Sequence, residues 1–519
     1  MKLLHPIALL LLLAASASAD VKLPAIFGSN MVLQRDKPIA IWGWADKGEE
    51  VTVTLGDANT AKTTADGDGK WMVKLAATKA SPVAQGSGLM LTIKGKNTIT
   101  LTNVLIGEVW ICSGQSNMQW TVRQSANADK AIAASNLPAI RLISVPRVPV
   151  GQPQKDFVGK WEVCGPETVP QFSAVGFFFG RDLLQHLNVP IGLINTSYGG
   201  TPVEAWTSRA SLESVASIKP LLEDWDKRVI EQTADKVAKQ NQDALKKWQD
   251  AAAKAKAANK AAPARPRPIV EAARSQNRPG NLYNGMISPL APLSVRGAIW
   301  YQGESNVPRA HQYQTLFPLM IQNWRADFGA DMPFGFVQLA PFRYTRNDPA
   351  WAAELWEAQL LTLKKVPNTG MAIITDVGDV KDIHPTNKEV PGQRLALWAR
   401  SQVYGEKDLV YSGPIYKSHK VEDGYIEIFF DHIGGGLVSR DGKHLSHFEI
   451  AGEDKVFVPA EVKIGSKSLI ISSKGMDKPV AVRFAWRDDA EPNLMNKEGI
   501  PASPFRTDTW KGLTEGKSY

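Results

Sequence analysis

Six apolar runs between residues 108 and 378 constrain the fold more than any other feature of this sequence. Each run is long enough for one buried strand, and amphipathic stretches such as AVGFFFGRDLLQHL and WAAELWEAQLLTLKKV lie between several of them. The six runs are EVWICS, IRLISV, VPIGLINTS, VRGAIWYQG, PFGFVQLA and GMAIITDVG. Buried strands that alternate with amphipathic helices are typical of α/β domains with a parallel sheet. We therefore predict such a sheet, with a ligand site at the carboxyl ends of its strands.

The stretches on either side of these runs show a β-only pattern. Apolar and polar residues alternate in EEVTVTLGD and NTITLTNV near the N-terminus, and again in YIEIFFDHI and SLIISSKG near the C-terminus. Such alternation is typical of small antiparallel sandwiches. A chain of 519 residues should hold about three domains. We expect an N-terminal β-domain at 20–104, an α/β domain in two parts at 105–208 and 279–404, and a C-terminal β-domain at 405–519.

Residues 209–278 interrupt the α/β pattern. They are strongly helix-forming at first and then become rich in Ala, Lys, Pro and Arg, as in AAAKAKAANKAAPARPRP. We interpret them as a helical insertion followed by a surface linker. The chain has a net charge of +8, and much of the basic excess lies between Lys246 and Arg278. A nucleic-acid binder would more often interleave basic residues with aromatics, so we expect no nucleic-acid partner.

The N-terminal sequence MKLLHPIALLLLLAASASAD has a lysine, an apolar run and then Ala-Ser-Ala. This pattern predicts a signal peptide at residues 1–19, with cleavage after Ala19. The alternative is a membrane anchor, but the apolar run is shorter than the ~20 residues that a membrane span needs. We therefore expect no membrane span in the mature chain, and a secreted or periplasmic location.

The chain has only two cysteines, Cys112 and Cys164. A secreted protein permits a disulfide between them, and two buried free thiols are the alternative. No cluster of Cys and His has the spacing of a zinc site, so the sequence predicts no metal centre.

The stretch EVWICSGQSNMQW contains the first candidate for catalysis. A buried strand ends there in a serine-rich polar turn, where Gly114 allows a tight bend and Ser116 follows at once. A serine in this position can act as a nucleophile, and its own N–H can help to bind an oxyanion. The alternative is a helix N-cap serine. The motif G-x-S-x-G of the α/β-hydrolases is not present.

Two further strand ends carry small or polar residues. NTSYGGTPVEAW places Gly199 and Gly200 after one strand, where they could present a backbone N–H or simply form a turn. AIWYQGESNVP places Gln302, Glu304 and Asn306 after another strand. Polar amides crowded at such a place are costly unless they are exposed or hydrogen-bonded, so a loop network is the alternative to a binding role.

The last strand is followed by TDVGDVKDIHPTNKEV, which contains His384 together with Asp376, Asp379 and Asp382. A nucleophilic serine needs a base, and the base needs a carboxylate that orients it. His384 is the histidine that stands at such a strand end beside acids. A capping or surface histidine is the alternative.

Taken together, these segments resemble the SGNH hydrolase superfamily and, more narrowly, the sialate O-acetylesterase family of carbohydrate esterases. The resemblance rests on GQSNM, SYGGTPVEAW, YQGESN and DIHPTNK, and also on LYNGMISPL and FGSNMVLQRDKPIAIWGWA. It implies an SGNH-type α/β/α sandwich with a parallel sheet, flanked by N-terminal and C-terminal β-sandwich-like domains.

The resemblance also implies roles for individual residues. Ser116 would be the nucleophile, His384 the general base and Asp382 its acid, with Asp379 as the second choice. The superfamily's usual Asp lies three residues before the His, where this chain has Lys381. The oxyanion hole would be formed by Ser116, Gly199 or Gly200, and Gln302, with Asn306 as an alternative to Gln302. Substrate-binding residues would be Gln115, Asn117, Glu304, Asn306, Trp120 and Trp206, although both tryptophans could equally be core residues.

The activity implied is hydrolysis of O-acetyl esters on sugars through an acyl-enzyme, with an acetylated carbohydrate as the partner and without a metal or organic cofactor. Sialic acid and wall polysaccharides such as acetylated xylan or pectin both remain possible substrates. The hypothesis from another class is a non-catalytic carbohydrate-binding protein on the same scaffold.

Overall fold

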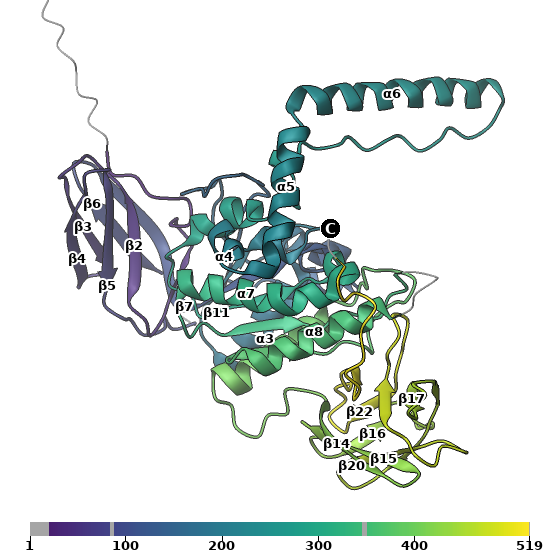
Figure 1. The fold of residues 1–519 in the computed structure, drawn as a ribbon. Helices are drawn as coiled ribbons and strands as arrows, with labels where there is room; N and C mark the ends of the chain where they lie inside the picture. The colour runs from purple at the N-terminus through teal and green to yellow at the C-terminus, as the bar shows by residue number, and fades with distance from the viewer. Residues whose placement is uncertain (1–19, 84–87, 345–349, 518–519) are drawn as a thin grey trace, which may run out of the picture.

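The computed structural model describes residues 20–83, 88–344 and 350–517, and the predicted signal peptide at 1–19 lies outside these ranges. Figure 1 shows a β-rich region in purple, a central region of helices and strands, and a β-rich region in yellow-green at the C-terminal end. The predicted α/β fold with β-rich regions on both sides is therefore confirmed.

The central sheet has the strand order β13-β12-β11-β7-β10-β8-β9. All neighbours along this path are parallel except β8 and β9. The strands are β7 (Thr98–Gly114), β8 (Ile140–Ser144), β9 (Glu162–Val163), β10 (Ile191–Asn195), β11 (Gly297–Tyr301), β12 (Phe334–Val337) and β13 (Thr369–Ala372). From β7 the chain crosses first to β8 and β10 on one side of β7, and then to β11 on the other side. The carboxyl end of β7 therefore lies at a topological switch point, where α/β sheets place their ligands.

Helices cover both faces of this sheet. On one face, α3 (Ala174–Leu187) packs against α9 (Glu389–Trp398), and Trp110 of β7 contacts the rings of Phe179 and Trp398. On the other face, α7 (Ala310–Phe328) packs against α8 (Trp351–Lys365), and Trp300 of β11 contacts Phe317 and Trp324. Since successive side chains of a strand point to opposite faces, the near-continuous apolar runs of the sequence supply both cores.

Strand β7 belongs to two regions at once. Its first residues pair antiparallel with β6 of the N-terminal region, and its later residues, from Glu108, pair parallel with β10. The boundary expected at residue 104 thus falls within one continuous strand. The remaining strands of this region are β1 (Val32–Gln34), β2 (Ile39–Trp44), β3 (Glu50–Leu55), β4 (Asn59–Thr64), β5 (Lys70–Leu75) and β6 (Leu89–Lys94). The buried side chains of this region and of the central region form one hydrophobic cluster.

The C-terminal region has a core of its own, formed by side chains such as Ile426, Ile428 and Phe484. Its sheets are β14-β15-β20-β19, β18-β17-β21-β23 and the pair β16-β22. The strands are β14 (Ile415–Glu422), β15 (Tyr425–Asp431), β16 (Leu437–Ser439), β17 (Phe448–Ala451), β18 (Phe457–Pro459), β19 (Glu461–Ile464), β20 (Ser468–Ser472), β21 (Ala481–Phe484), β22 (Leu494–Asn496) and β23 (Phe505–Arg506).

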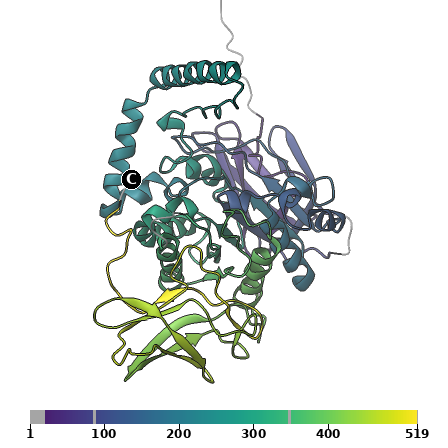
Figure 2. The ribbon, with the colours of Figure 1, turned by 90° about the vertical axis from the view of Figure 1, so that its right-hand side faces the viewer.

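The segment 209–278 divides into a packed part and a projecting part. Helix α5 (Lys219–Glu231) buries Leu221, Leu222 and Trp225, whereas α6 (Ala234–Ala257) buries only Val237. Figures 1 and 2 both show α6 extending away from the central region, with the following chain running back beside it. The remaining α-helices are short: α1 (Ser116–Gln119), α2 (Ala128–Ala133) and α4 (Arg209–Glu213).

Cys112 and Cys164 are free thiols and are both buried. Burial raises the pKa of the Cys112 thiol, and it also raises that of Cys164. Of the two alternatives that the sequence leaves open, the structure therefore shows separate, inert thiols. Within the described ranges, no helix combines the length and the apolar character that crossing a bilayer requires.

Candidate active site

Ser116 lies directly beyond the carboxyl end of β7. The strand ends at Gly114, whose φ is +139°, and a Cβ there would lie 2.2 Å from the Tyr301 carbonyl oxygen. Glycine is therefore required for the chain to turn so close to β11. Gln115 occupies the N-cap position and Ser116 is the first residue of α1. The hydroxyl of Ser116 is thus not used as a helix cap, and its N–H is one of the first-turn donors without an intrahelical acceptor.

The imidazole of His384 reaches Ser116 from the loop after β13. Its Nε2 lies 2.9 Å from Ser116 Oγ, and both side chains are only partly buried. The Trp120 ring stacks on this imidazole, with ring centres 5.1 Å apart and an interplanar angle of 19°. Burial lowers the pKa of His384, the Lys388 charge lowers it further, and Asp382 opposes both effects. At neutral pH His384 is therefore uncharged and able to accept the serine proton.

The three acids of this loop differ in position. Asp382 Oδ1 lies 3.9 Å from His384 Nδ1 and accepts the backbone N–H of His384 at 2.9 Å. Asp379 accepts the backbone N–H of Lys381 at 2.8 Å instead. Asp376 forms a two-fold ion pair with Arg394. Asp382 is thus the acid beside the imidazole, although its side chain is 57% exposed and too far from Nδ1 for a direct hydrogen bond.

Gly199 lies against the serine. A Cβ on Gly199 would be 3.1 Å from Ser116 Cβ, and the Gly199 N–H donates to Gln119 Oε1 at 2.7 Å. Gly200 adopts a left-handed φ of +71° and has more open space around it. The Gly199 amide therefore lies close to the serine, and a polar side chain of α1 holds it there.

Gln302 and Asn306 are fully buried and form a hydrogen bond with each other. Gln302 Nε2 donates to Thr201 O at 3.1 Å and to Asn306 Oδ1 at 2.7 Å. Asn306 in turn accepts the Val203 N–H and donates to the buried Glu204. Both amide hydrogens of Gln302 are thus used inside the protein. In this arrangement Gln302 holds the loop after Gly199 and Gly200, and it has no hydrogen left to offer an oxyanion.

A buried polar network connects the serine helix to the histidine loop. Lys388 Nζ donates to Asn117 Oδ1 and to Pro385 O, while Asn117 Nδ2 donates to Ile383 O at 3.0 Å and to Glu304. Burial lowers the pKa of Lys388 to about 7 and raises the pKa of Glu304. The backbone on both sides of His384 is therefore fixed to the residue that follows Ser116.

The sequence pattern did not single out Lys388, which lies within DIHPTNK. The signal that could have found it is a lysine four residues after the histidine, directly before the helix Glu389–Trp398. Asn117 and Glu304, expected to bind substrate, are buried members of this network, and Gln115 is also buried. Their side chains support the site from within.

The two candidate tryptophans differ as well. Trp206 is fully buried, with its indole N–H donated to Thr201 Oγ1, so its faces are not available to a sugar. Trp120 is partly exposed and lies over His384. Gln276, which the sequence did not suggest, donates to the Gly199 carbonyl oxygen at 3.1 Å.

A serine hydroxyl hydrogen-bonded to a neutral imidazole, at the carboxyl edge of a parallel sheet with helices on both faces, defines the class of serine-dependent ester hydrolases. Among the described residues no group of three or more His, Cys, Asp and Glu could hold a metal ion.

Comparisons with known proteins narrow this class. Residues 270–396 match the family described as "Carbohydrate esterase, sialic acid-specific acetylesterase". The human sialate O-acetylesterase is 31% identical over 94% of this chain and 93% of its own, and the mouse enzyme is 30% identical over 92% of both. The crystal structure of a carbohydrate acetylesterase from Xanthomonas citri matches 95% of this chain and all of its own, at 35% identity and a TM-score of 0.79.

The chain belongs to the sialate O-acetylesterase family of carbohydrate esterases. It is a carboxylic ester hydrolase that removes O-acetyl groups from carbohydrate.

Proposed function

We propose that Ser116 and His384 carry out this deacetylation and that the acetylated sugar is a sialic acid. The observation that supports the catalytic assignment is the 2.9 Å contact between Ser116 Oγ and His384 Nε2. The choice of sugar rests on the mammalian relatives. They are sialate O-acetylesterases, and this chain matches them over nearly their whole length.

In the proposed reaction, Ser116 Oγ attacks the acetyl carbonyl carbon while His384 Nε2 takes the hydroxyl proton. The tetrahedral intermediate collapses, the sugar hydroxyl leaves with that proton, and the acetyl group stays on Ser116. Water then attacks the acetyl-serine with His384 again as base, and acetate is released.

The oxyanion would be bound by the N–H groups of Ser116 and Gly199. The first is an N-terminal donor of α1, and the second now donates to Gln119 Oε1, an acceptor that the oxyanion would replace. Gln302 and Asn306 would hold the loop that follows Gly199 and Gly200, through the backbone of Thr201 and Val203. Asp382 would hold and charge-stabilise the imidazole, since its carboxylate faces Nδ1.

We also propose that residues 1–19 are a cleaved signal peptide, and that the mature enzyme acts outside the cytoplasm. The apolar run followed by Ala-Ser-Ala supports this proposal.

The test is Ser116→Ala, assayed for acetate release from O-acetylated sialic acid and from p-nitrophenyl acetate. Loss of a nucleophile should lower kcat by about three orders of magnitude or more while circular dichroism stays unchanged. A folded Ser116→Ala protein with near-normal turnover would refute the serine mechanism. A native enzyme that cleaves p-nitrophenyl acetate but not acetylated sialic acid would refute the choice of sugar alone.

A further inference from the structure

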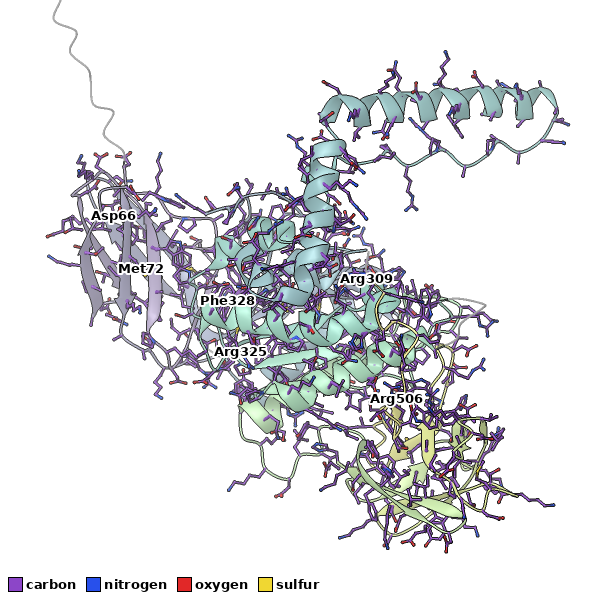
Figure 3. The ribbon with its side chains drawn as sticks, in the orientation of Figure 1. Asp66, Met72, Arg309, Arg325, Phe328 and Arg506 are labelled. Carbon is purple, nitrogen blue, oxygen red and sulfur yellow. The ribbon has the colours of Figure 1, made fainter. Side chains whose placement is uncertain are left out.

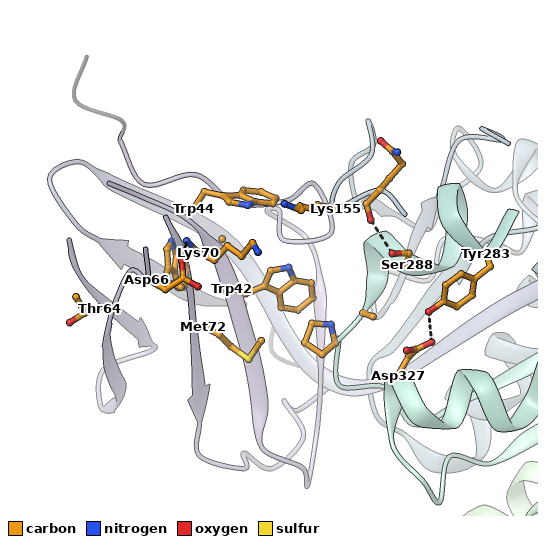
Figure 4. A pocket seen from close by; sticks show the side chains of 15 residues that line it. Trp42, Trp44, Thr64, Asp66, Lys70, Met72, Lys155, Tyr283, Ser288 and Asp327 are labelled. Carbon is orange, nitrogen blue, oxygen red and sulfur yellow. Dashed lines mark hydrogen bonds between the residues drawn. The ribbon is translucent and has the colours of Figure 1, made fainter. Parts of the chain in front are cut away.

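A cleft of about 560 Å³ lies between the N-terminal β-region and the central region (Figure 4). Its size and its place between two structural units are typical of small-molecule sites. A second hollow of about 410 Å³ shares Met72 and Pro292 with it. The two hollows therefore adjoin at Met72 and Pro292, and we refer to them together as the groove.

One wall of the cleft is aromatic. Trp42 and Trp44 stand two residues apart on β2 and therefore on the same face, and their partners on β5 across the pair are Met72 and Lys70. Trp44 is partly exposed, and Met72 is 42% exposed although it is a large apolar residue. Figure 4 shows Trp42 and Met72 directed toward the central region.

The opposite wall is polar. Tyr283, the first residue of the short π-helix Tyr283–Ile287, donates its hydroxyl to Asp327 Oδ2 at 2.9 Å, and Ser288 donates to the Gln154 carbonyl oxygen. A phenol oxygen that donates one hydrogen bond can still accept another, and so can a serine hydroxyl. Burial raises the pKa of Asp327, as expected for a carboxyl recessed between two parts of the molecule.

The groove lies at the other end of the sheet from Ser116. Pro292 of the cleft precedes β11, whereas Gln302 follows it. Gly114, which leads into the serine turn, pairs with Tyr301 at the carboxyl end of β11. Five residues of extended strand separate these ends, which is roughly 15 Å at about 3.3 Å per residue. In Figure 3 Met72 and Asp66 lie on the N-terminal β-region, far from Arg309 at the start of α7. The cleft is therefore separate from the catalytic residues.

We propose that this groove is a second, non-catalytic carbohydrate-binding site, which holds neutral pyranose units of the glycan that carries the acetylated sugar. The flat indole of Trp44 would pack on the apolar face of a pyranose ring, and hydroxyls of the sugar would donate to Tyr283, Ser288 and Asp327. The proposal rests on the carbohydrate esterase activity for the nature of the ligand. It does not depend on the roles proposed for Ser116 and His384.

The experiment uses the full chain with Ser116→Ala, so that no substrate is turned over. Cellohexaose, xylohexaose and 3′-sialyllactose are titrated separately by isothermal calorimetry, to distinguish the sources of the pyranose units. At least one should bind, and adding Trp44→Ala should weaken its binding about five- to tenfold, the effect of losing one stacked aromatic ring. Trp248→Ala on the projecting helix α6 is the matched control and should leave the binding unchanged.

Met72→Glu provides a second variant at an exposed position and should weaken binding in the same way. In the native background, Trp44→Ala should leave kcat/KM for p-nitrophenyl acetate unchanged, because this small ester needs only the serine site. The proposal is overturned if none of the three glycans binds, or if Trp44→Ala and Met72→Glu bind as tightly as the parent. Either result would leave the Ser116→Ala test of the catalytic mechanism intact.

Discussion

The loop that carries His384 and the far part of the segment 209–278 are both connections between packed elements, yet they are held very differently. The His384 loop is fixed to Asn117 by Lys388 and by the hydrogen bond to the Ile383 carbonyl oxygen, and the side chains of Asn117 and Lys388 are buried. Helix α6 buries only Val237, and exposed contacts such as Asn241 to Ile269 connect it to the chain that returns beside it (Figure 2).

The comparison shows where rigidity is needed. A serine and a histidine must stay within hydrogen-bond reach, and a displacement of about 1 Å can cost as much as 10²-fold in rate. Buried polar groups that satisfy one another hold such a geometry, although each is costly if its partner is lost. The projecting helix has no such requirement, and its composition is accordingly polar and rich in alanine.

The largest effect expected here concerns the glycine beside the serine. Gly199→Ala adds a methyl group 3.1 Å from Ser116 Cβ, tight enough to move the amide proposed for the oxyanion hole. We expect kcat for p-nitrophenyl acetate to fall about 10²-fold, the cost of losing one oxyanion donor, with little change in melting temperature.

Gly200→Asn is the matched control for this prediction. Asn tolerates a left-handed φ, and the nearest atom to a Cβ there is Gln276 Nε2 at 3.7 Å. Gly200→Asn should therefore keep most of the activity. The opposite ranking of the two variants would assign the oxyanion amide to Gly200.

A smaller effect is expected for the acid beside His384. Asp382→Asn should lower kcat/KM about tenfold, well below the about 10⁴-fold of a buried triad aspartate, because this carboxylate is 57% exposed and 3.9 Å from Nδ1. Asp379→Asn should have less effect, since Asp379 is occupied with the Lys381 amide. Steady-state kinetics of both variants decide the order, and a larger loss for Asp379→Asn would move the role to that residue.

The pH profile tests the same assignment through the direction in which its acid limb shifts. His384 must be neutral to act as base, and its pKa lies below the usual 6.5, so the acid limb of kcat/KM should lie below pH 6.5. The Asp382 charge raises the pKa of His384. Removing it in Asp382→Asn should lower that pKa and move the acid limb to lower pH. A shift to higher pH would contradict the assignment.

Much of this site could be predicted from the sequence because strand ends are local signals. Apolar runs that end before Ser116, Gly199 and His384 indicate the carboxyl edge of the sheet, and the structure does place these residues together there. The network of Lys388 with Asn117 and Glu304 could not be read in this way. It joins residues far apart in the chain, whose burial is decided only by tertiary packing.

The same limit explains why two residues that the sequence assigned to the site are buried beneath it. Trp206 and Gln302 stand beside strand ends in the sequence, and their patterns do not reveal on which side of the loop they lie. In the structure Trp206 packs against Trp300, and Gln302 supports the Thr201 backbone. A polar or aromatic residue next to a catalytic motif thus serves to hold the loop as readily as to touch a ligand.

The smallest effect concerns the projecting part of the insertion and separates its far end from its near end. Deleting residues 250–268 removes the last part of α6 and most of the returning chain, but it leaves in place Gln276, which donates to the Gly199 carbonyl oxygen. Because the deleted residues are mostly exposed, kcat/KM for p-nitrophenyl acetate should stay within about twofold of the native value. Gln276→Ala is the contrasting variant. It removes the hydrogen bond from this segment to the carbonyl oxygen of Gly199, so it should lower kcat several-fold while the deletion does not. A deletion protein that is folded by circular dichroism yet loses activity would show that the projecting helix shapes the site. The contrast between the fixed His384 loop and the projecting helix α6 would then not hold.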